Sequence, residues 1–123
     1  MNRLLLLPLI AVLSSCTNAA KGEPIYLKCD IKKDYFPSEI TINPGKEFGT
    51  ISWKGSSGNE VSAKAQQFIS SDSYKLKEVD GTTITTWSIS RTDGSATRTT
   101  EIGTNAIFSE GKCKKIKRAK TLF

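Results

Sequence analysis

The sequence predicts an all-β domain, an antiparallel meander of seven or eight strands that forms a small barrel or sandwich closed by one disulfide. Four observations support this prediction. Apolar and polar residues alternate at the period of a strand in most segments between residues 25 and 102. Turn-forming clusters recur about every eight to twelve residues, as they do in small all-β domains. No segment shows a convincing helical stripe, and one cysteine lies near each end of the domain.

The first strands are indicated by alternation between turn signals. Residues 25–31 alternate apolar and polar side chains and place Cys29 on the apolar side. Residues 34–37, Asp-Tyr-Phe-Pro, interrupt this pattern, which resumes over residues 40–42. Residues 43–45, Asn-Pro-Gly, then form a turn, because proline presets φ and glycine accepts a positive φ.

The middle of the chain contains one ambiguous segment. Residues 48–54 form the next expected strand, and the glycine- and serine-rich residues 55–59 form a turn. Residues 60–69 alternate at strand period, although their alanines and glutamines favour a helix. Because this segment lies between two turn clusters, we expect a strand.

Further strands are expected over residues 74–79, 82–91, 95–102 and 107–108, with a last strand that begins at Cys113. The strongest is 82–91, which is rich in β-branched residues. Asp93 and Gly94 follow it, and this dipeptide is the strongest short-range signal for a hairpin.

Residues 1–20 are typical of a signal peptide. A ten-residue apolar run, 4–13, follows a short positive start; it is too short to span a bilayer and is followed by small polar residues. Residues 13–16, Leu-Ser-Ser-Cys, resemble a lipobox, in which Cys16 would be lipidated. Ordinary cleavage after Ala19 is the alternative. We therefore expect an exported chain in the periplasm or cell envelope, membrane-anchored if Cys16 is modified and otherwise secreted, with a single domain over residues 21–123.

The two remaining cysteines, Cys29 and Cys113, are expected to pair. Export delivers them to an oxidising compartment where disulfides persist, and two cysteines allow a single connectivity. A zinc site lacks ligands, because the chain contains no histidine and no second cysteine pair.

The net positive charge lies at the C-terminus. Residues 21–111 carry eleven basic and twelve acidic side chains, whereas residues 112–120 carry six basic ones and no acid. Such a run can attract anionic surfaces, and Lys114, Lys115 and Lys117 are candidate contacts. We favour the alternative of a solvated final strand or tail whose lysines protect a sheet edge, with only weak binding to anionic surfaces. A monomer is expected.

The sequence offers no catalytic or cofactor motif. Without histidine there is no Ser-His or Cys-His nucleophile, and the carboxylates are scattered singly through turns and strand edges. No cofactor or metal is expected, and the chain is not expected to be an enzyme. Trp53 and Trp87 could stack on a sugar ring or a base, but both lie at the apolar phase of their strands, so we expect them in the core. Arg91 is a candidate ligand or partner contact, but we favour the alternatives that it covers the mouth of the barrel or pairs with Asp93.

Three short motifs carry a resemblance. They are the early cysteine at the end of Tyr-Leu-Lys-Cys (26–29), the Ile-x-Arg-x-x-Gly hairpin (89–94), and Gly-Lys-Cys (111–113) before a lysine-rich end. In this order they resemble a family of small exported bacterial proteins, cyanobacterial ones included, of unassigned function. The resemblance implies a compact β fold and supplies no activity.

A weaker likeness is to the periplasmic lysozyme inhibitors built on a small β-barrel. These have a Tyr-x-Cys near the start and a cysteine in the last strand, but Tyr26 lies one residue too early here. Their Ser-Gly-x-Lys/Arg-Tyr loop is absent, since residues 57–61 read Ser-Gly-Asn-Glu-Val. The expected function is thus a non-enzymatic binding or structural module of the envelope, with inhibition of a hydrolase such as lysozyme as the alternative.

Overall fold

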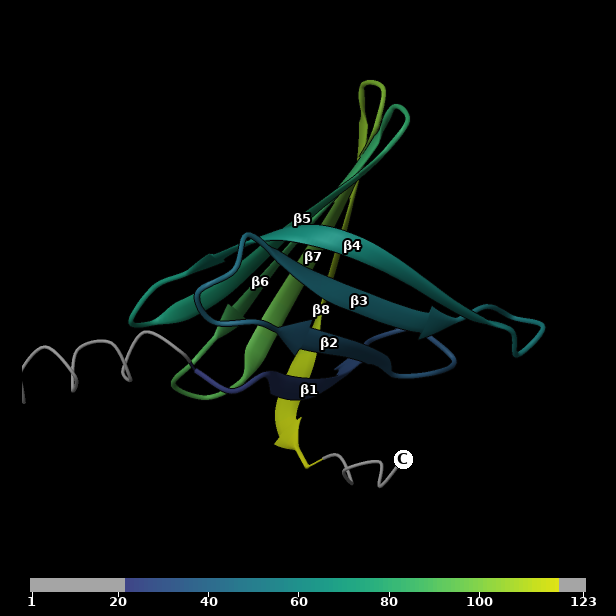
Figure 1. The fold of residues 1–123 in the computed structure, drawn as a ribbon. Coiled ribbons are helices and arrows are strands. Elements are labelled where there is room, and N and C mark those ends of the chain that lie inside the picture. Colours follow the sequence, from purple (N-terminus) through teal and green to yellow (C-terminus); the bar gives the residue numbers. More distant parts are fainter. Residues whose placement is uncertain (1–21, 118–123) are drawn as a thin grey trace, which may run out of the picture.

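The computed structural model describes residues 22–117 and shows a closed barrel of eight antiparallel strands (Figure 1). Each strand pairs with the next along the chain, and the last pairs with the first, so the prediction of an all-β antiparallel meander is confirmed and the barrel is chosen over the sandwich. The strands are β1 (Ile25–Ile31), β2 (Ser38–Ile42), β3 (Phe48–Lys54), β4 (Glu60–Ile69), β5 (Ser73–Asp80), β6 (Thr83–Ser90), β7 (Ser95–Ile102) and β8 (Asn105–Ile116).

The predicted leader lies outside the described residues, and so do Cys16, Arg118 and Lys120. Within residues 22–117 there is no helix that could span a membrane.

The segment that could have been helix or strand is β4, a ten-residue strand. Gln67, one of the residues that favoured a helix, is buried and points into the barrel. Its side-chain amide donates to the carbonyl oxygens of Asn43 and Lys46, and its oxygen accepts from the backbone N–H of Asn43. The buried glutamine therefore connects β4 to the β2–β3 turn by hydrogen bonds. Local helix or strand propensity does not reveal this role.

The expected division of the C-terminal region into two strands is wrong. Residues 105–116 form the single strand β8, which pairs with β7 through Lys112 and with β1 from Gly111 onward. Gly111 lies where β8 passes from one partner to the other, and a β-carbon there would collide with the carbonyl oxygen of Asp30. The glycine permits a close approach of two strands and does not end the strand.

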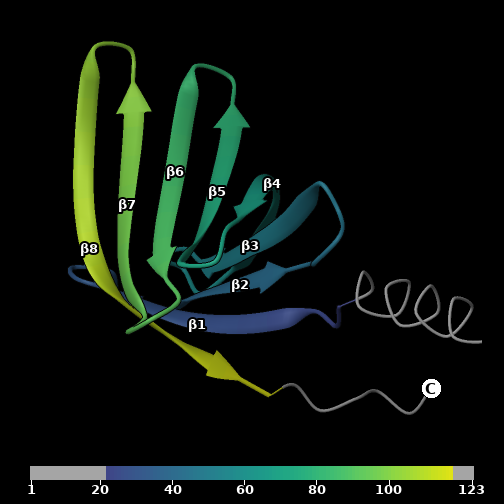
Figure 2. The same cartoon turned by 90° about the vertical axis from the view of Figure 1, so that its left-hand side faces the viewer.

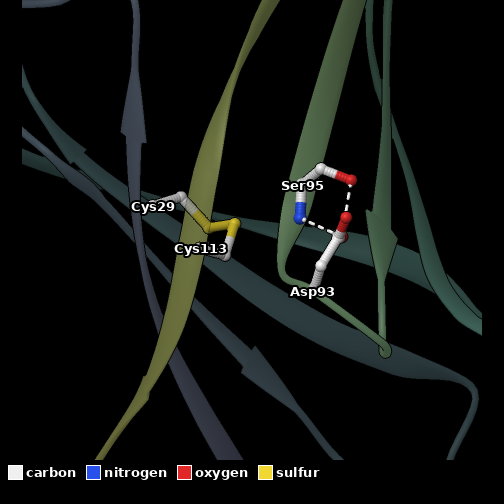
Figure 3. The surroundings of a disulfide bond; sticks show 4 residues. All are labelled: Cys29, Asp93, Ser95 and Cys113. Atoms are coloured by element: carbon white, nitrogen blue, oxygen red, sulfur yellow. Dashed lines mark hydrogen bonds between the residues drawn. A yellow bond between two sulfur atoms is a disulfide. The ribbon is translucent and has the colours of Figure 1, made fainter.

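The predicted disulfide joins Cys29 of β1 to Cys113 of β8, with an S–S distance of 2.03 Å (Figure 3). The two cysteines are directly opposite each other in the strand pair that closes the barrel. The bond is compatible with an oxidising compartment such as an exported protein reaches.

The hairpin that Asp93 and Gly94 predict is present between β6 and β7, with a four-residue loop over residues 91–94. Gly94 has a φ of 78°, and its N–H donates to the carbonyl oxygen of Ser90. The Asp93 carboxylate accepts from the N–H and the hydroxyl of Ser95 at 2.9 and 2.8 Å (Figure 3). These hydrogen bonds lower the pKa of Asp93 because they stabilise its charged form.

The core fills only one end of the barrel. The most deeply buried side chains include Ile40, Ile42, Ile51, Leu76 and Ile89. They lie toward the closed end, which we define by the turns β2–β3, β4–β5 and β6–β7. The opposite, open end carries the other four turns, and there the β5–β6 and β7–β8 hairpins project beyond the rest of the barrel as two arms (Figures 1 and 2).

Candidate functional site: the open end of the barrel

The inward positions of the strands change from apolar to polar as the strands approach the open end. In β5 the inward series is Tyr74, Leu76 and Glu78, and the first two are buried in the core. In β7 the buried Ala96 is followed at the same phase by Arg98. Side chains in a strand alternate between two faces, so these charged groups face the interior. At the open end, side chains therefore line the interior of the barrel and do not fill it.

A pocket of about 340 Å³ occupies this end. That volume is at the lower end of the range for small-molecule sites. It is lined by four aromatic residues, four hydroxyl residues, five charged residues and Ile51: Tyr35, Phe36, Trp53 and Trp87; Ser38, Ser56, Thr85 and Thr100; Lys33, Asp34, Lys54, Glu78 and Arg98.

The two tryptophans play different parts in the pocket. Trp87 is 2% exposed and belongs to the core, as its phase in β6 predicts. Trp53 is only partly buried and packs against the edge of the core, so part of its surface is open to the pocket. The prediction that both tryptophans pack in the core is thus confirmed for Trp87 and only partly correct for Trp53.

Arg98 organises one side of the pocket. Its guanidinium lies 5.5 Å from the centre of the Trp87 ring, directly across the strand pair. Two of its nitrogens bind the two carboxylate oxygens of Asp34, Nη1 to Oδ2 at 2.8 Å and Nη2 to Oδ1 at 3.1 Å. Such a two-point contact is stronger and more directional than a single ion pair.

The loop between β1 and β2 is thereby held over the mouth. Asp34 attaches the loop to β7, while Lys32 attaches it to β8 through its N–H to the carbonyl oxygen of Glu110 at 2.9 Å and its ammonium to the carboxylate at 3.1 Å. This loop presents Tyr35 and Phe36 to the pocket, and the ammonium of Lys54 lies 5.9 Å from the Phe36 ring centre. Two ion pairs therefore position the aromatic residues of the loop.

Glu78 is the second carboxylate of the pocket. Partial burial raises its pKa, and the neighbouring charge of Asp80 raises it further. Arg98 is bound to Asp34, and no ion pair of Glu78 occurs among residues 22–117. The pocket thus offers one acidic group that a ligand could bind.

The site residues suggested by the sequence lie elsewhere. Arg91 is at the closed end, where its guanidinium lies 4.8 Å from the Tyr74 ring centre and donates to the carbonyl oxygen of Ser70 at 2.6 Å. It covers an end of the barrel, as one alternative predicts, but the end away from the pocket. The carboxylate of Asp93 instead accepts a hydrogen bond from the backbone N–H of Ser95.

The lysines of β8 also lie near the closed end and do not form one patch. Lys114 and Lys115 are both exposed, and they point to opposite faces of the strand. Lys114 lies directly opposite Lys28 of β1, and Lys115 opposite Leu27. Lys117 follows the end of the strand.

Sequence reasoning overlooked Arg98 and Glu78, although a signal for both was present. Each continues an apolar inward series by one position, where a charged side chain is not expected unless the barrel is open there. The partnership of Arg98 with Asp34 spans 64 residues and could not be read from the pattern.

The pocket residues could support recognition better than bond-making chemistry. Trp53 and Phe36 can stack on a flat apolar surface, the four hydroxyls can exchange hydrogen bonds, and Glu78 can accept one. Among residues 22–117, no three histidine, cysteine, aspartate or glutamate side chains cluster as a metal site would require.

Comparisons with models of known protein families, with curated proteins and with solved structures returned no match for this chain. The likeness to small exported bacterial proteins therefore stays a prediction, and so does the weaker likeness to lysozyme inhibitors.

Proposed function

We propose that the chain is a non-enzymatic binding protein of the cell envelope that takes a small ligand at the open end of its barrel. The observation that carries this proposal is the pocket, in which Trp53, Phe36 and the unpaired Glu78 surround a space about the size of a small organic molecule. Surfaces of this kind bind ligands that have a flat apolar face and polar edges, and a sugar ring has both.

The carboxylates that residues 22–117 contribute to the pocket support binding over catalysis. Of its two carboxylates, Asp34 is held by Arg98, which leaves Glu78 without a second free acid. Hydrolysis of a glycosidic bond commonly requires two carboxyl groups on either side of the bond. The proposal places the protein in the periplasm or envelope after export, with a lipid anchor if Cys16 is modified.

The test measures the mass of the complex and its intrinsic fluorescence. The exported chain is incubated with the small-molecule fraction of an envelope extract and analysed by native mass spectrometry. We expect an added mass on the wild-type chain and its loss in Trp53→Ala. Phe68→Ala, which removes an exposed ring from the outer surface, is the matched control and should keep the added mass. Since both tryptophans of the chain line the pocket, the purified ligand should also change the intrinsic fluorescence.

Two results would refute the proposal. One is a wild-type chain that carries no added mass from any extract. The other is an added mass that Trp53→Ala retains in full.

A second candidate function, inhibition of a basic hydrolase such as lysozyme, is favoured by the charge of the arms. The tips of the two arms, residues 78–85 and 99–108, contain three acidic side chains, Glu78, Asp80 and Glu101, and no basic one. The lysines of β8 that would repel a basic enzyme lie toward the other end of the barrel. Projecting acidic arms could therefore approach a basic cleft, with complementary charge promoting the encounter.

This candidate is tested by the rate of bacterial cell-wall lysis by a basic lysozyme. Inhibition at micromolar protein that is relieved by Asp80→Lys, and kept by Glu23→Lys at the exposed start of the barrel, would support it. No inhibition by the wild-type chain would eliminate it.

A further inference from the structure

Within residues 22–117, part of the edge of β8 has no neighbouring strand. β8 pairs with β7 along residues 105–112, but β1 pairs with it only from Gly111 to Ile116. The segment 105–110 in the arm therefore has one open side (Figure 2). Its apolar side chains Ile107 and Phe108 are 57% and 64% exposed.

The hydrogen-bonding groups on this open side can be assigned from the hairpin. Ile102 and Asn105 flank the two-residue turn, and in such a turn the flanking residues bond to each other. Alternation then directs the N–H and C=O groups of residues 105, 107 and 109 toward β7 and those of 106 and 108 away from it. The bond from Lys32 N–H to the carbonyl oxygen of Glu110 fits this phase, because 110 also faces away from β7.

Five of the six residues of this edge lack the features that usually prevent strand pairing, whereas the sixth, Glu110, is charged and paired with Lys32. Residues 105–109, Asn-Ala-Ile-Phe-Ser, contain no charge and no proline. Natural proteins commonly protect an exposed edge with lysine, proline, a bulge or a covering loop. Here the β1–β2 loop reaches the edge only at Glu110. A neutral edge with exposed apolar residues is suited to adding another strand.

We propose that this edge pairs with the same edge of a second copy of the chain, in antiparallel register centred on Ile107. In this register Ala106 of each copy exchanges hydrogen bonds with Phe108 of the other. The two Ile107 side chains face each other on one side of the sheet, and each Phe108 lies across from an Ala106 on the other side. The segment is thus complementary to itself, as a two-fold symmetric interface requires.

The surroundings of the segment fit this arrangement. In the proposed register Glu110 lies opposite Thr104 of the second copy, so the tip of each arm reaches the point where the β1–β2 loop begins. The charge of Glu110 is already paired with Lys32 and does not oppose the contact. Because the strands run in opposite directions, the two barrels lie at opposite ends of the shared sheet. The expectation of a monomer did not take this edge into account.

The oligomeric state tests the proposal directly. The exported chain is prepared with Cys16→Ser, so that a lipid cannot drive association, and is examined by sedimentation velocity over a range of concentrations. We expect a concentration-dependent dimer, and we expect Ile107→Lys to weaken it by roughly tenfold or more, because it places like charges opposite each other. Val79→Lys is the matched control on the other arm, where Val79 is 61% exposed, and it should leave the dimer unchanged.

The register is tested by cross-linking. Opposed residues of a non-hydrogen-bonded pair have Cα atoms about 4.5 Å apart, which a disulfide can bridge. Ile107→Cys should therefore form a linked dimer under mild oxidation. Ser109→Cys should not, because the two copies of residue 109 would be separated by roughly 13 Å along the sheet. A wild-type chain that stays monomeric at every concentration, or a dimer that Ile107→Lys leaves intact, would overturn the proposal; cross-linking through Ser109→Cys would overturn its register.

Discussion

Gly94 meets two requirements at the β6–β7 turn. Its φ of 78° lies in the left-handed region that side chains disfavour, and a β-carbon added to it would collide with the carbonyl oxygen of Cys113. The N–H of Cys113 also donates to the carbonyl oxygen of Gly94 at 2.7 Å. A turn residue thus fixes how closely β8 approaches this hairpin.

Comparing a Gly94 substitution with the same substitution at Gly103 should separate the effects of these two requirements on stability. We expect Gly94→Ala to lower the free energy of unfolding by about 2–4 kcal/mol, because conformational strain is combined with a backbone collision. Gly103→Ala is the matched control: its φ is 61°, but its β-carbon would meet open space. It should cost only about 1–2 kcal/mol. Urea denaturation measures both, and equal losses would show that the collision is relieved by a small shift of β8.

Glu78 is a residue whose charge opposes folding. Burial and the charge of Asp80 raise its pKa in the folded chain, so the folded state holds the proton more tightly than the unfolded state. Above both pKa values the carboxylate is charged in both states, and the folded state is destabilised. Below both values the carboxyl is neutral in both states, and the destabilisation disappears.

Glu78→Gln should therefore raise the melting temperature at pH 7. The gain should shrink as the pH falls toward about 4.3, where an unfolded glutamate titrates. Melting curves of both chains between pH 7 and pH 4 measure this difference. Glu23→Gln, at an exposed position before β1, is the control and should change the melting temperature less. A gain that does not depend on pH would show that the effect comes from packing and not from charge.

Among the elements, β8 has the greatest effect on the architecture. Its two halves have different partner strands: the first extends the arm beside β7, and the second closes the barrel beside β1. The disulfide is in the second half, where it joins the first strand to the last. The covalent bond therefore secures the closure of the barrel and leaves the arm without a covalent attachment.

Reduction of the disulfide should destabilise the barrel without removing its topology. A bond across 84 residues stabilises a chain mainly by restricting its unfolded state, typically by about 2–4 kcal/mol. For a domain of this size, that corresponds to a fall in melting temperature of roughly 10 °C or more. Thermal unfolding of the oxidised chain is compared with that of the double variant Cys29→Ser, Cys113→Ser. Equal melting temperatures would show that strand pairing alone closes the barrel.

At the scale of the whole molecule, basic groups occur at both ends of the barrel. Lys33, Lys54 and Arg98 line the pocket at the open end. Lys28, Lys114 and Lys115 lie toward the closed end, with Lys117 after the end of β8. Because Lys114 and Lys115 occupy opposite faces of β8, no single strong patch is formed. Such dispersed surface charges attract anionic surfaces weakly and are screened by salt.

Binding to anionic vesicles should thus be weak and sensitive to salt. We expect measurable association at low salt that is lost near 0.15 M, where the Debye length is about 8 Å. The triple variant Lys114→Gln, Lys115→Gln, Lys117→Gln should weaken it further. The control Lys64→Gln, Lys75→Gln, Lys77→Gln removes the same charge from β4 and β5 and should have a smaller effect. Vesicle flotation measures all three chains, and binding that survives physiological salt would contradict the prediction.

Local patterns predicted the strands of this fold better than they predicted its site. Alternation and turn residues located the first seven strands, and the pairing of Cys29 with Cys113 followed from the number of cysteines. The continuous strand β8 was missed, and the role of Gly111 within it depends on the nearby backbone of Asp30, which is distant in sequence. The pocket was missed because it is assembled from separate elements, most clearly in the pairing of Arg98 with Asp34.

Because the number of strands is even, the first strand begins and the last strand ends at the same end of the barrel, opposite the pocket. β1 begins and β8 ends at the closed end of the barrel, where Tyr26 lies opposite Ile116. A lipid attached through Cys16 would therefore hold the molecule by the end opposite its pocket, and the lysines near that end would face the same anionic membrane. Anchored in this way, a single copy would direct its mouth and both arms away from the membrane, whereas in the proposed dimer the closed ends of the two copies would point in opposite directions.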